Sequence, residues 1–126
     1  MTRLLIIGLG GFIGAIARYS VTLWIQERST SNVPLGTMAV NVIGCYLLGF
    51  LAAWLSSRAD QGESWSLFLR VGLLGAFTTF STLGFETVEL AADGNWRAAG
   101  LSLAGNLVLG IFAVMLGSAS ARALHG

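Results

Sequence analysis

Four apolar segments divide the chain, and each is long enough to cross a lipid bilayer as a helix. They cover about residues 4–25, 35–55, 65–90 and 96–119. A helical span needs about 20 mostly apolar residues, and a helix satisfies its own backbone hydrogen bonds, as lipid requires. Only 10% of the 126 residues are charged, whereas a soluble domain has about 25%. The sequence therefore predicts an all-α membrane protein with four transmembrane helices, with residues 1–126 forming a single transmembrane domain.

The arginines are shared almost equally between the two membrane sides that four spans would define. The side with both termini and the second loop carries Arg3, Arg58, Arg70 and Arg122. The opposite side carries Arg18, Arg28 and Arg97. The positive-inside rule needs a bias in such charges to select an orientation. One hypothesis is therefore a dual topology, in which two copies meet as an antiparallel dimer; the other is a single topology set by subtler signals.

Pairs of small residues favour close packing of the helices. Gly10 and Gly14 are four residues apart in the first segment, and small residues let helix backbones approach closely in lipid. Such a pair serves either contact between two copies or ordinary packing within one chain. A dimer of eight helices would enclose a polar site more completely than four helices.

The third segment contains the decapeptide GAFTTFSTLG, residues 75–84, which is a poor helix-forming sequence at membrane depth. Glycine and β-branched threonine weaken a helix, and hydroxyl side chains compete for backbone groups. We therefore expect the third helix to be broken near its centre. Non-helical backbone at this depth is tolerated where it is buried in protein or lines a cavity. The freed carbonyls could hold a cation, and half-helix N-termini favour an anion.

Other spans carry polar residues at helical spacing. Thr37 and Asn41 are four residues apart in the second segment, and so are Ser102 and Asn106 in the fourth. Residues at this spacing share a helix face. Neutral donors can replace the hydration shell of a small anion, whereas a fixed charge could hold it too tightly for conduction. The positive ring edge of Phe80 could also approach an anion.

Charged and catalytic groups are sparse. Arg18 lies inside the first span, where it either faces a cavity or extends to the interface. Glu86, one turn after Thr82, could pair with an arginine. The sequence contains no cluster of metal ligands, no Ser/His/Asp set and no phosphate-binding loop, which argues against an enzyme. A formal net charge of +1 provides no basic field for nucleic acid.

Three runs resemble the signature segments of the Fluc, or CrcB-type, fluoride channels. They are GGFIGAIARY (10–19), GTMAVNVIG (36–44) and GAFTTFSTLGFE (75–86). The resemblance covers essentially the whole chain in length, number of spans and motif order. It implies an antiparallel dual-topology homodimer in the plasma (cell inner) membrane with two fluoride pores and a central structural sodium ion. Such a channel passively exports fluoride from the cytoplasm and prevents its toxic accumulation.

The resemblance also implies roles for individual residues. Backbone carbonyls of Gly75 and Thr78, from both subunits, would hold the sodium ion. Arg18 matches the first-helix arginine of the family, and Glu86 matches the glutamate that follows its paired phenylalanines. The residues that would line the fluoride pore are Asn41, Phe80, Ser81, Thr82, Thr79, Thr37, Asn106 and Ser102.

One residue departs from the family pattern. The usual sequence is TTFSTF, whereas this chain reads TTFSTL and has Leu83 at the second phenylalanine. Leucine offers no aromatic edge to an anion. Either the second ring is dispensable, or Phe85 or Phe77 replaces it, or a partner chain carries it. The last possibility corresponds to a heterodimer with a paralogue.

Two other classes of small membrane protein compete with the channel. A proton-coupled exporter of cationic drugs has the same size and number of spans, but it needs a carboxylate in its first helix. The first segment of this chain has Arg18 and no acid, which disfavours that class. A membrane assembly factor would use the polar groups only to join helices, and it would conduct no ions.

Overall fold

The computed structural model describes residues 1–56 and 62–125, and all regular secondary structure in these ranges is helical. The elements are α1 (Thr2–Gln26), α2 (Leu35–Ser56), α3 (Glu63–Ser66), the π-helix η1 (Leu67–Leu74), α4 (Gly75–Phe77), α5 (Phe80–Ala92) and α6 (Trp96–His125). Four stretches are long and apolar enough to cross a membrane: Thr2–Gln26, Leu35–Ser56, Glu63–Ala92 and Trp96–Leu124. The prediction of an all-helical chain with four spans is thus confirmed for the described residues. Arg58, which entered the charge comparison, lies outside them.

Local sequence explains where several helices begin and end. Pro34 directly precedes α2, and its carbonyl accepts the first helical bond from the Met38 backbone nitrogen at 3.2 Å. Proline is tolerated at a helix start because the N–H that it lacks would have no partner there. The Asn95 side chain caps α6 by accepting from the Ala98 nitrogen at 3.3 Å. Gly94, in the turn between α5 and α6, has a φ of 79°, a conformation that glycine adopts without strain.

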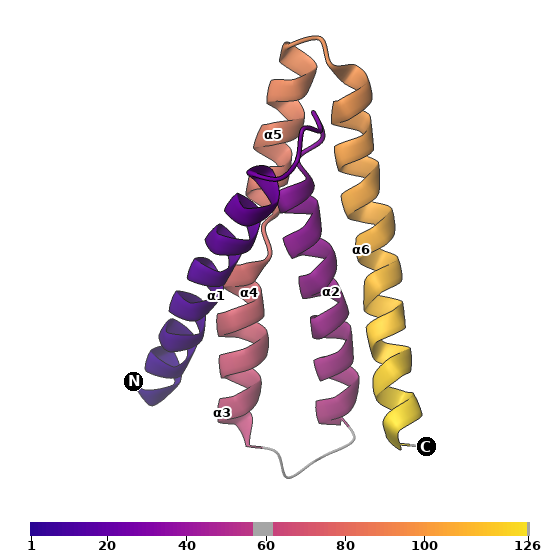
Figure 1. Cartoon of the computed structure of the whole chain (residues 1–126). Coiled ribbons are helices and arrows are strands. Elements are labelled where there is room, and N and C mark those ends of the chain that lie inside the picture. Colours follow the sequence, from indigo (N-terminus) through magenta and orange to yellow (C-terminus); the bar gives the residue numbers. More distant parts are fainter. Residues whose placement is uncertain (57–61, 126) are drawn as a thin grey trace.

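The four spans are arranged so that both termini lie at one end of the molecule, together with the end of α2 and the start of α3 (Figure 1). The turn between α5 and α6 lies at the other end (Figure 1). Arg3 Nη2 pairs with Glu63 Oε2 at 2.8 Å, which links the first turn of α1 to α3. Both side chains are exposed, so the pair contributes little to stability, but it marks this end of the bundle.

Glycines allow α1 to cross the third span at close range. A Cβ on Gly10 would lie 2.9 Å from the Leu73 backbone nitrogen and 3.1 Å from the Gly72 Cα, closer than ordinary Cβ contacts. A Cβ on Gly14 would also meet the Leu73 backbone. The two glycines therefore serve packing within the chain. The structure thus supports the within-chain reading of this pair.

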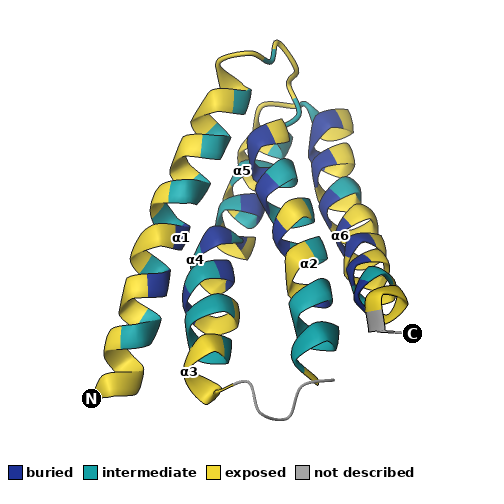
Figure 2. Ribbon diagram, turned by 60° about the horizontal axis from the view of Figure 1, so that its bottom comes forward, coloured by how far each residue is buried: buried dark blue, intermediate teal, exposed yellow. Residues whose placement is uncertain are grey.

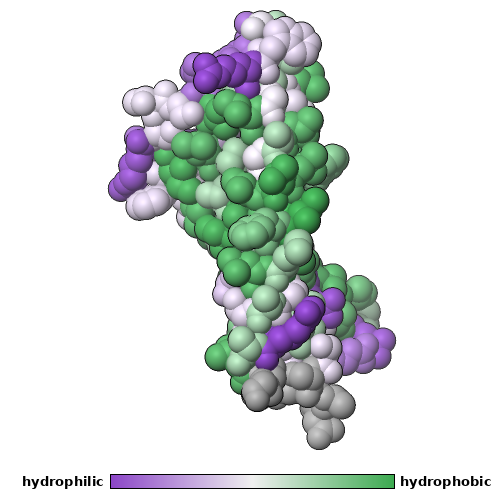
Figure 3. Space-filling model, turned by 90° about the vertical axis from the view of Figure 1, so that its right-hand side faces the viewer, coloured by the Kyte–Doolittle hydropathy of each residue, from purple (hydrophilic) through white to green (hydrophobic). Residues whose placement is uncertain are grey.

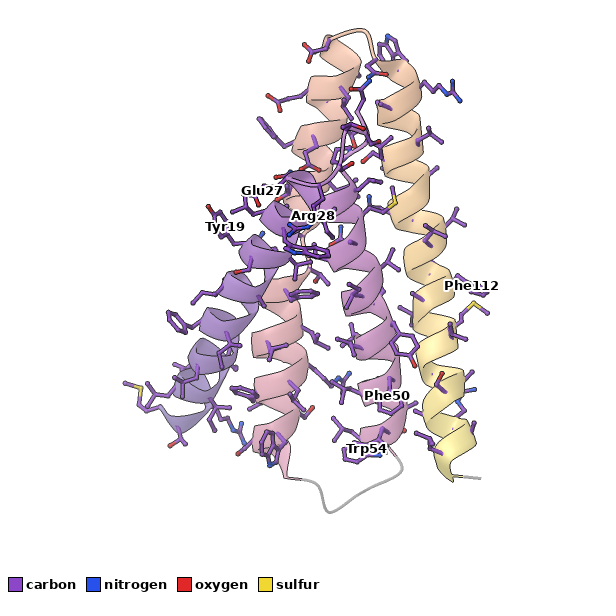
Figure 4. The ribbon with its side chains drawn as sticks, in the orientation of Figure 1. Tyr19, Glu27, Arg28, Phe50, Trp54 and Phe112 are labelled. Carbon is purple, nitrogen blue, oxygen red and sulfur yellow. The ribbon has the colours of Figure 1, made fainter. Side chains whose placement is uncertain are left out.

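The surface is mostly apolar between two polar ends. Figure 3 shows a broad hydrophobic band with hydrophilic residues gathered toward both ends. Buried residues line the facing sides of α2, α6 and the third span, whereas α1 is largely exposed (Figure 2). Phe112 points outward from α6 (Figure 4) and is 62% exposed. Large exposed apolar side chains suit a surface that lipid or another chain covers.

Aromatic residues lie near the ends of the spans. At the end of α1, the Arg28 guanidinium lies 4.5 Å from the centroid of the Trp24 ring. Trp54 lies near the opposite membrane side, at the end of α2 (Figure 4). Trp65 and Trp96 belong to the first turns of α3 and α6. These positions suit interfacial anchors, because tryptophan favours the boundary between lipid and water.

Candidate functional site

The site forms around two residues with extended backbone inside the third span. Thr78 has φ −87° and ψ 158°, and Thr79 has φ −151° and ψ 116°. They separate α4, which ends at Phe77, from α5, which begins at Phe80. Extended backbone leaves peptide groups without helical partners, so other groups must satisfy them at membrane depth.

The Asn41 side chain from α2 forms hydrogen bonds with the backbone N–H and C=O groups of Thr79. Its Oδ1 accepts a hydrogen bond from the Thr79 backbone nitrogen at 2.8 Å, and its Nδ2 donates to the Thr79 carbonyl at 3.0 Å. The same Nδ2 donates to Asn106 Oδ1 on α6 at 2.8 Å. An amide nitrogen carries two hydrogens, so both donors of Asn41 are used by the protein. Asn41 therefore joins three spans by holding the extended segment.

Asn106 retains an unused donor. Its Nδ2 donates to the Ser102 carbonyl one turn earlier at 2.8 Å, which leaves the second hydrogen of that amide. Asn106 and Ser102 are both buried, as their shared helix face predicts. The hydroxyl oxygen of Ser102 is also buried and has no hydrogen-bond partner among the described residues. The fourth span therefore places a buried amide against Asn41 and a buried hydroxyl one turn before that amide.

The hydroxyl residues of the motif organise the start of α5. Thr79 Oγ1 caps this helix by accepting from the Thr82 nitrogen at 3.2 Å, and it donates to Thr82 Oγ1 at 2.9 Å. The Ser81 hydroxyl lies 3.4 Å from Thr79 Oγ1. Because the Thr82 oxygen accepts, its proton remains for another partner. Thr82 is half-buried and Ser81 is exposed.

Glu86 pairs with a hydroxyl and not with an arginine. Thr37 Oγ1 donates to Glu86 Oε1 at 2.8 Å, and Glu86 Oε2 is buried without a hydrogen-bond partner among the described residues. In the same ranges the one ion pair is that between Arg3 and Glu63. The suggested pairing of Glu86 with an arginine is therefore absent from the described residues.

The aromatic residues of the motif differ in exposure. Phe80 is 77% exposed and Phe85 is 64% exposed, whereas Leu83 is 2% exposed and Phe77 is 7% exposed. Phe80 and Leu83 line the same cavity, described below, but Phe77 and Phe85 do not. Within one chain, neither of these two rings lines the cavity to which Leu83 belongs.

Two separate cavities have Thr79 in their linings. We name the first the Asn106 cavity; it has a volume of about 260 Å³ and lies between α2, α6 and the third span. Its lining includes Asn41, Arg70, Gly75, Thr78, Thr79, Phe80, Leu83 and Asn106. The second, the Arg18 cavity, has a volume of about 240 Å³ and is lined by Arg18, Tyr19, Thr22, Thr37, Thr79 and Thr82.

A third cavity of about 370 Å³ continues from Glu86 to the loop between α1 and α2. We name it the loop cavity. Glu86, Glu89 and Asp93 line one side of it, and the opposite side is formed by residues 26–36. The hydrogen bond from Thr37 to Glu86 joins the lining of the Arg18 cavity to that of the loop cavity.

Most of the polar residues that line these cavities could be named from the sequence, but Arg70 was not among them. Arg70 was counted only as a charge on the side of the termini, whereas the structure places it, exposed, in the lining of the Asn106 cavity. The available signal was its position seven residues after Glu63, well inside the third span. An arginine at such depth commonly marks an ion path. Arg18 faces a cavity, which was one of its two expected placements.

Comparison with known proteins identifies the family. The family described as CrcB-like protein, Camphor Resistance (CrcB), matches residues 5–118. The chain belongs to this CrcB-like family. The resemblance inferred from the three sequence motifs is thus confirmed.

Several curated relatives of this CrcB-like chain are similar along nearly their whole length. "Fluoride-specific ion channel FluC" of Acidobacterium capsulatum is 44% identical over 111 residues, which cover 88% of this chain and 89% of the relative. The protein of the same name from Roseiflexus sp. is 42% identical, covering 97% of this chain and 98% of the relative. That from Chloroflexus aurantiacus is 40% identical over all 126 residues of this chain and the whole relative.

These findings settle the class of the CrcB-like chain. The relatives carry the names of ion channels and not of enzymes, as the lack of catalytic motifs predicted. With four spans, the chain is a multi-pass membrane protein, and in bacteria such a protein lies in the inner membrane.

Proposed function

We propose that the chain forms a passive, fluoride-selective channel. The observation that carries the proposal is the extended Thr78–Thr79 segment at membrane depth, held by Asn41 and flanked by two cavities. Irregular backbone in a membrane protein is tolerated where it lines a cavity. The names of the similar proteins specify the ion.

The donors left around the segment suit a small anion. Asn106, which has one amide hydrogen without a partner among the described residues, lines the Asn106 cavity, and Thr82, whose hydroxyl proton is available, lines the Arg18 cavity. Phe80 adds its ring to the Asn106 cavity, and the edge of a phenyl ring carries partial positive charge. These donors would replace water around fluoride, while Asn41 keeps them in position.

The three cavities would form successive parts of one path. Fluoride in the Asn106 cavity would pass Thr79 to reach the Arg18 cavity, and then pass Thr37 toward the loop cavity. Ser81 and Thr82 would donate hydrogen bonds from their hydroxyl groups to the ion near Thr79. Neutral donors bind an anion loosely enough for it to leave again.

A sodium ion fits the carbonyls of Gly75 and Thr78. In a helix, the Gly75 carbonyl would accept from the Thr79 nitrogen, but that nitrogen donates to Asn41. Likewise, the Thr78 carbonyl would accept from the Thr82 nitrogen, which instead donates to Thr79 Oγ1. Both carbonyls thus lose their ordinary donors, and sodium prefers oxygen ligands of this kind. When bound, the ion would neutralise these dipoles and stabilise the interrupted span.

The functional unit that we propose is an antiparallel dual-topology homodimer with two pores. Gly75 and Phe80 lie on a face that no described residue covers, and both line the Asn106 cavity. A second copy would cover this face and supply the other two carbonyls for sodium. A paralogue could occupy the same place in a heterodimer, with its own phenylalanine opposite Leu83. In the cell, the channel would export fluoride from the cytoplasm.

Fluoride efflux from liposomes tests the proposal. Liposomes containing the purified protein should release fluoride rapidly and retain chloride, which a fluoride electrode and a chloride electrode can measure. Protein-free liposomes provide the background. No fluoride release, or equal release of both ions, would refute a fluoride-selective channel.

A further inference from the structure

We propose that Arg70 supplies the positive charge that draws anions into the Asn106 cavity from the side of the chain termini. This inference rests on the proposed channel function and names an entry residue for it. Its basis is the position of an arginine inside a membrane span, on a cavity that leads to the extended segment.

Arg70 lies well inside the third span, away from the end that Glu63 marks. It follows Glu63 by seven residues, and Glu63 marks the end of the bundle through its pair with Arg3. At a helical rise of about 1.5 Å per residue, the Arg70 backbone lies roughly 10 Å further into the membrane. A charged side chain at this depth is costly, and it usually faces a water-filled cavity or a partner. Among the described residues, Arg70 forms no ion pair. It is exposed in the single chain and lines the Asn106 cavity, so this cavity is the polar environment within the chain that lies next to it.

The Asn106 cavity is polar at one end and charged at the other. Of the described residues that line it, Arg70 alone carries a charge. Leu48 and Asn41 also line it from α2; they are seven residues apart, or roughly 10 Å along the helix. The cavity thus extends from the level of Leu48 to the amides of Asn41 and Asn106.

The distance between Arg70 and the amides of Asn41 and Asn106 allows the charge to attract an anion without holding it at the extended segment. A cation at the outer part of a cavity raises the local concentration of anions. The same charge beside the narrowest part would bind the ion too tightly for rapid release. Here the guanidinium comes from η1, eight residues before Thr78, whereas neutral amides surround the extended segment.

The backbone around Arg70 is also unusual. Arg70 lies within the π-helix Leu67–Leu74, whose hydrogen bonds join residues five apart. Gly75, five residues later, lines the same cavity. π-Helical turns are rare and are frequent at functional sites. The Arg18 cavity has an arginine of its own, so the proposed path carries one cationic residue on each side of Thr79.

The test compares fluoride efflux from liposomes containing wild type, R70Q, R70K and the control R122Q, which removes an exposed arginine near the C-terminus. At about 0.01 M ionic strength, where charges act over about 30 Å, R70Q should lower efflux on the order of tenfold. The deficit should shrink when an impermeant salt is added, because screening removes the contribution of Arg70. R70K should retain most of the flux, and R122Q should behave as wild type.

A titratable variant tests the charge within one folded protein. R70H should conduct better at pH 5.5 than at pH 7.5, relative to wild type at each pH, because histidine gains its charge near pH 6.5. Efflux of R70Q equal to wild type at low salt would overturn the inference and would indicate that Arg70 extends to lipid headgroups. So would a deficit that salt leaves unchanged, or an R70H ratio independent of pH. Absence of efflux from wild type would instead refute the channel itself, and this inference with it.

Discussion

Replacing Asn41 with alanine tests whether this amide holds the backbone or binds the conducted ion. The wild-type side chain accepts from the Thr79 nitrogen at 2.8 Å and donates to the Thr79 carbonyl at 3.0 Å. It also donates to Asn106 Oδ1 at 2.8 Å. Alanine would leave these three partner atoms unpaired at the centre of the bundle, so we expect both folding stability and fluoride flux to fall.

The size of the stability loss follows from those three atoms. A buried polar group left without its partner costs about 1–3 kcal/mol. The adjacent Asn106 cavity, with a volume of about 260 Å³, has room for water, which occupies about 30 Å³ per molecule in the liquid. Water would partly satisfy the exposed atoms of Thr79 and Asn106. For three atoms the cost would be about 3–9 kcal/mol. Because water offsets part of it, we expect N41A to lose about 3 kcal/mol in the free energy of unfolding, which is the lower limit of this range.

The assay combines unfolding in detergent micelles with fluoride efflux from liposomes. The matched control is T87V, which removes one hydrogen bond from Thr87 Oγ1 to the Leu83 carbonyl, 2.7 Å long, at nearly constant volume. That variant should lose about 1 kcal/mol and keep its flux. A double-mutant cycle with N106A should give a coupling energy of about 0.5–3 kcal/mol, as expected for groups in direct contact.

One result would refute the reasoning. If N41A loses fluoride flux but unfolds like wild type or like T87V, the Asn41 amide is not needed to hold the extended segment. Its principal contact would then be with the ion, and the hydrogen bonds to Thr79 and Asn106 would be dispensable. A coupling energy near zero in the cycle with N106A would lead to the same conclusion.

Three further predictions concern the cavity lining and the cation. F80I should lower fluoride efflux by about two- to twelvefold, because an aromatic contact is worth about 0.5–1.5 kcal/mol and about 1.4 kcal/mol corresponds to tenfold, while the unfolding of the solubilised protein stays unchanged; unaltered efflux would remove Phe80 from the path. L83F should lower the free energy of unfolding by no more than about 1 kcal/mol, because the larger ring can extend into the Asn106 cavity of about 260 Å³ that Leu83 lines; a loss of about 3 kcal/mol would show that the buried site excludes the ring, and higher flux at unchanged stability would indicate a missing second ring. Complete replacement of sodium by a large organic cation should abolish efflux, and returning sodium should restore it; efflux that persists after full exchange would argue against a cation at the Gly75 and Thr78 carbonyls.

Much of the site could be predicted from residue type and spacing. Thr37 and Asn41 share a face of α2, and Ser102 and Asn106 share a face of α6, as the spacing of four residues requires. The weak helix propensity of the TTFST run anticipated extended backbone, which the structure has at Thr78 and Thr79. These inferences succeeded because they depend on one helix or one short segment at a time.

Other features depended on contacts between spans. Sequence reasoning treated Asn41 as a donor to the ion, but the Thr79 carbonyl and Asn106 use both of its hydrogens. An arginine was named as a possible partner of Glu86, whereas Thr37 donates to its carboxylate. Each outcome depends on which residue of a neighbouring helix lies opposite, and sequence spacing within one helix does not specify that.

By itself, the sequence determined that this chain crosses the membrane four times, because lipid demands long apolar helices and the charge content leaves no alternative. It also determined that the helix of the third span is weakest at residues 75–84, because helix propensity depends on local sequence. Only the tertiary structure decided the burial of Leu83, the one amide hydrogen of Asn106 that has no partner among the described residues, and the placement of Arg70 on a cavity. The physical reason is the close crossing of α1 and η1 at Gly10 and Gly72 and the packing of α2 on α6, which set the rotation of each helix. That rotation selects which polar groups pair with the protein and which remain for an ion.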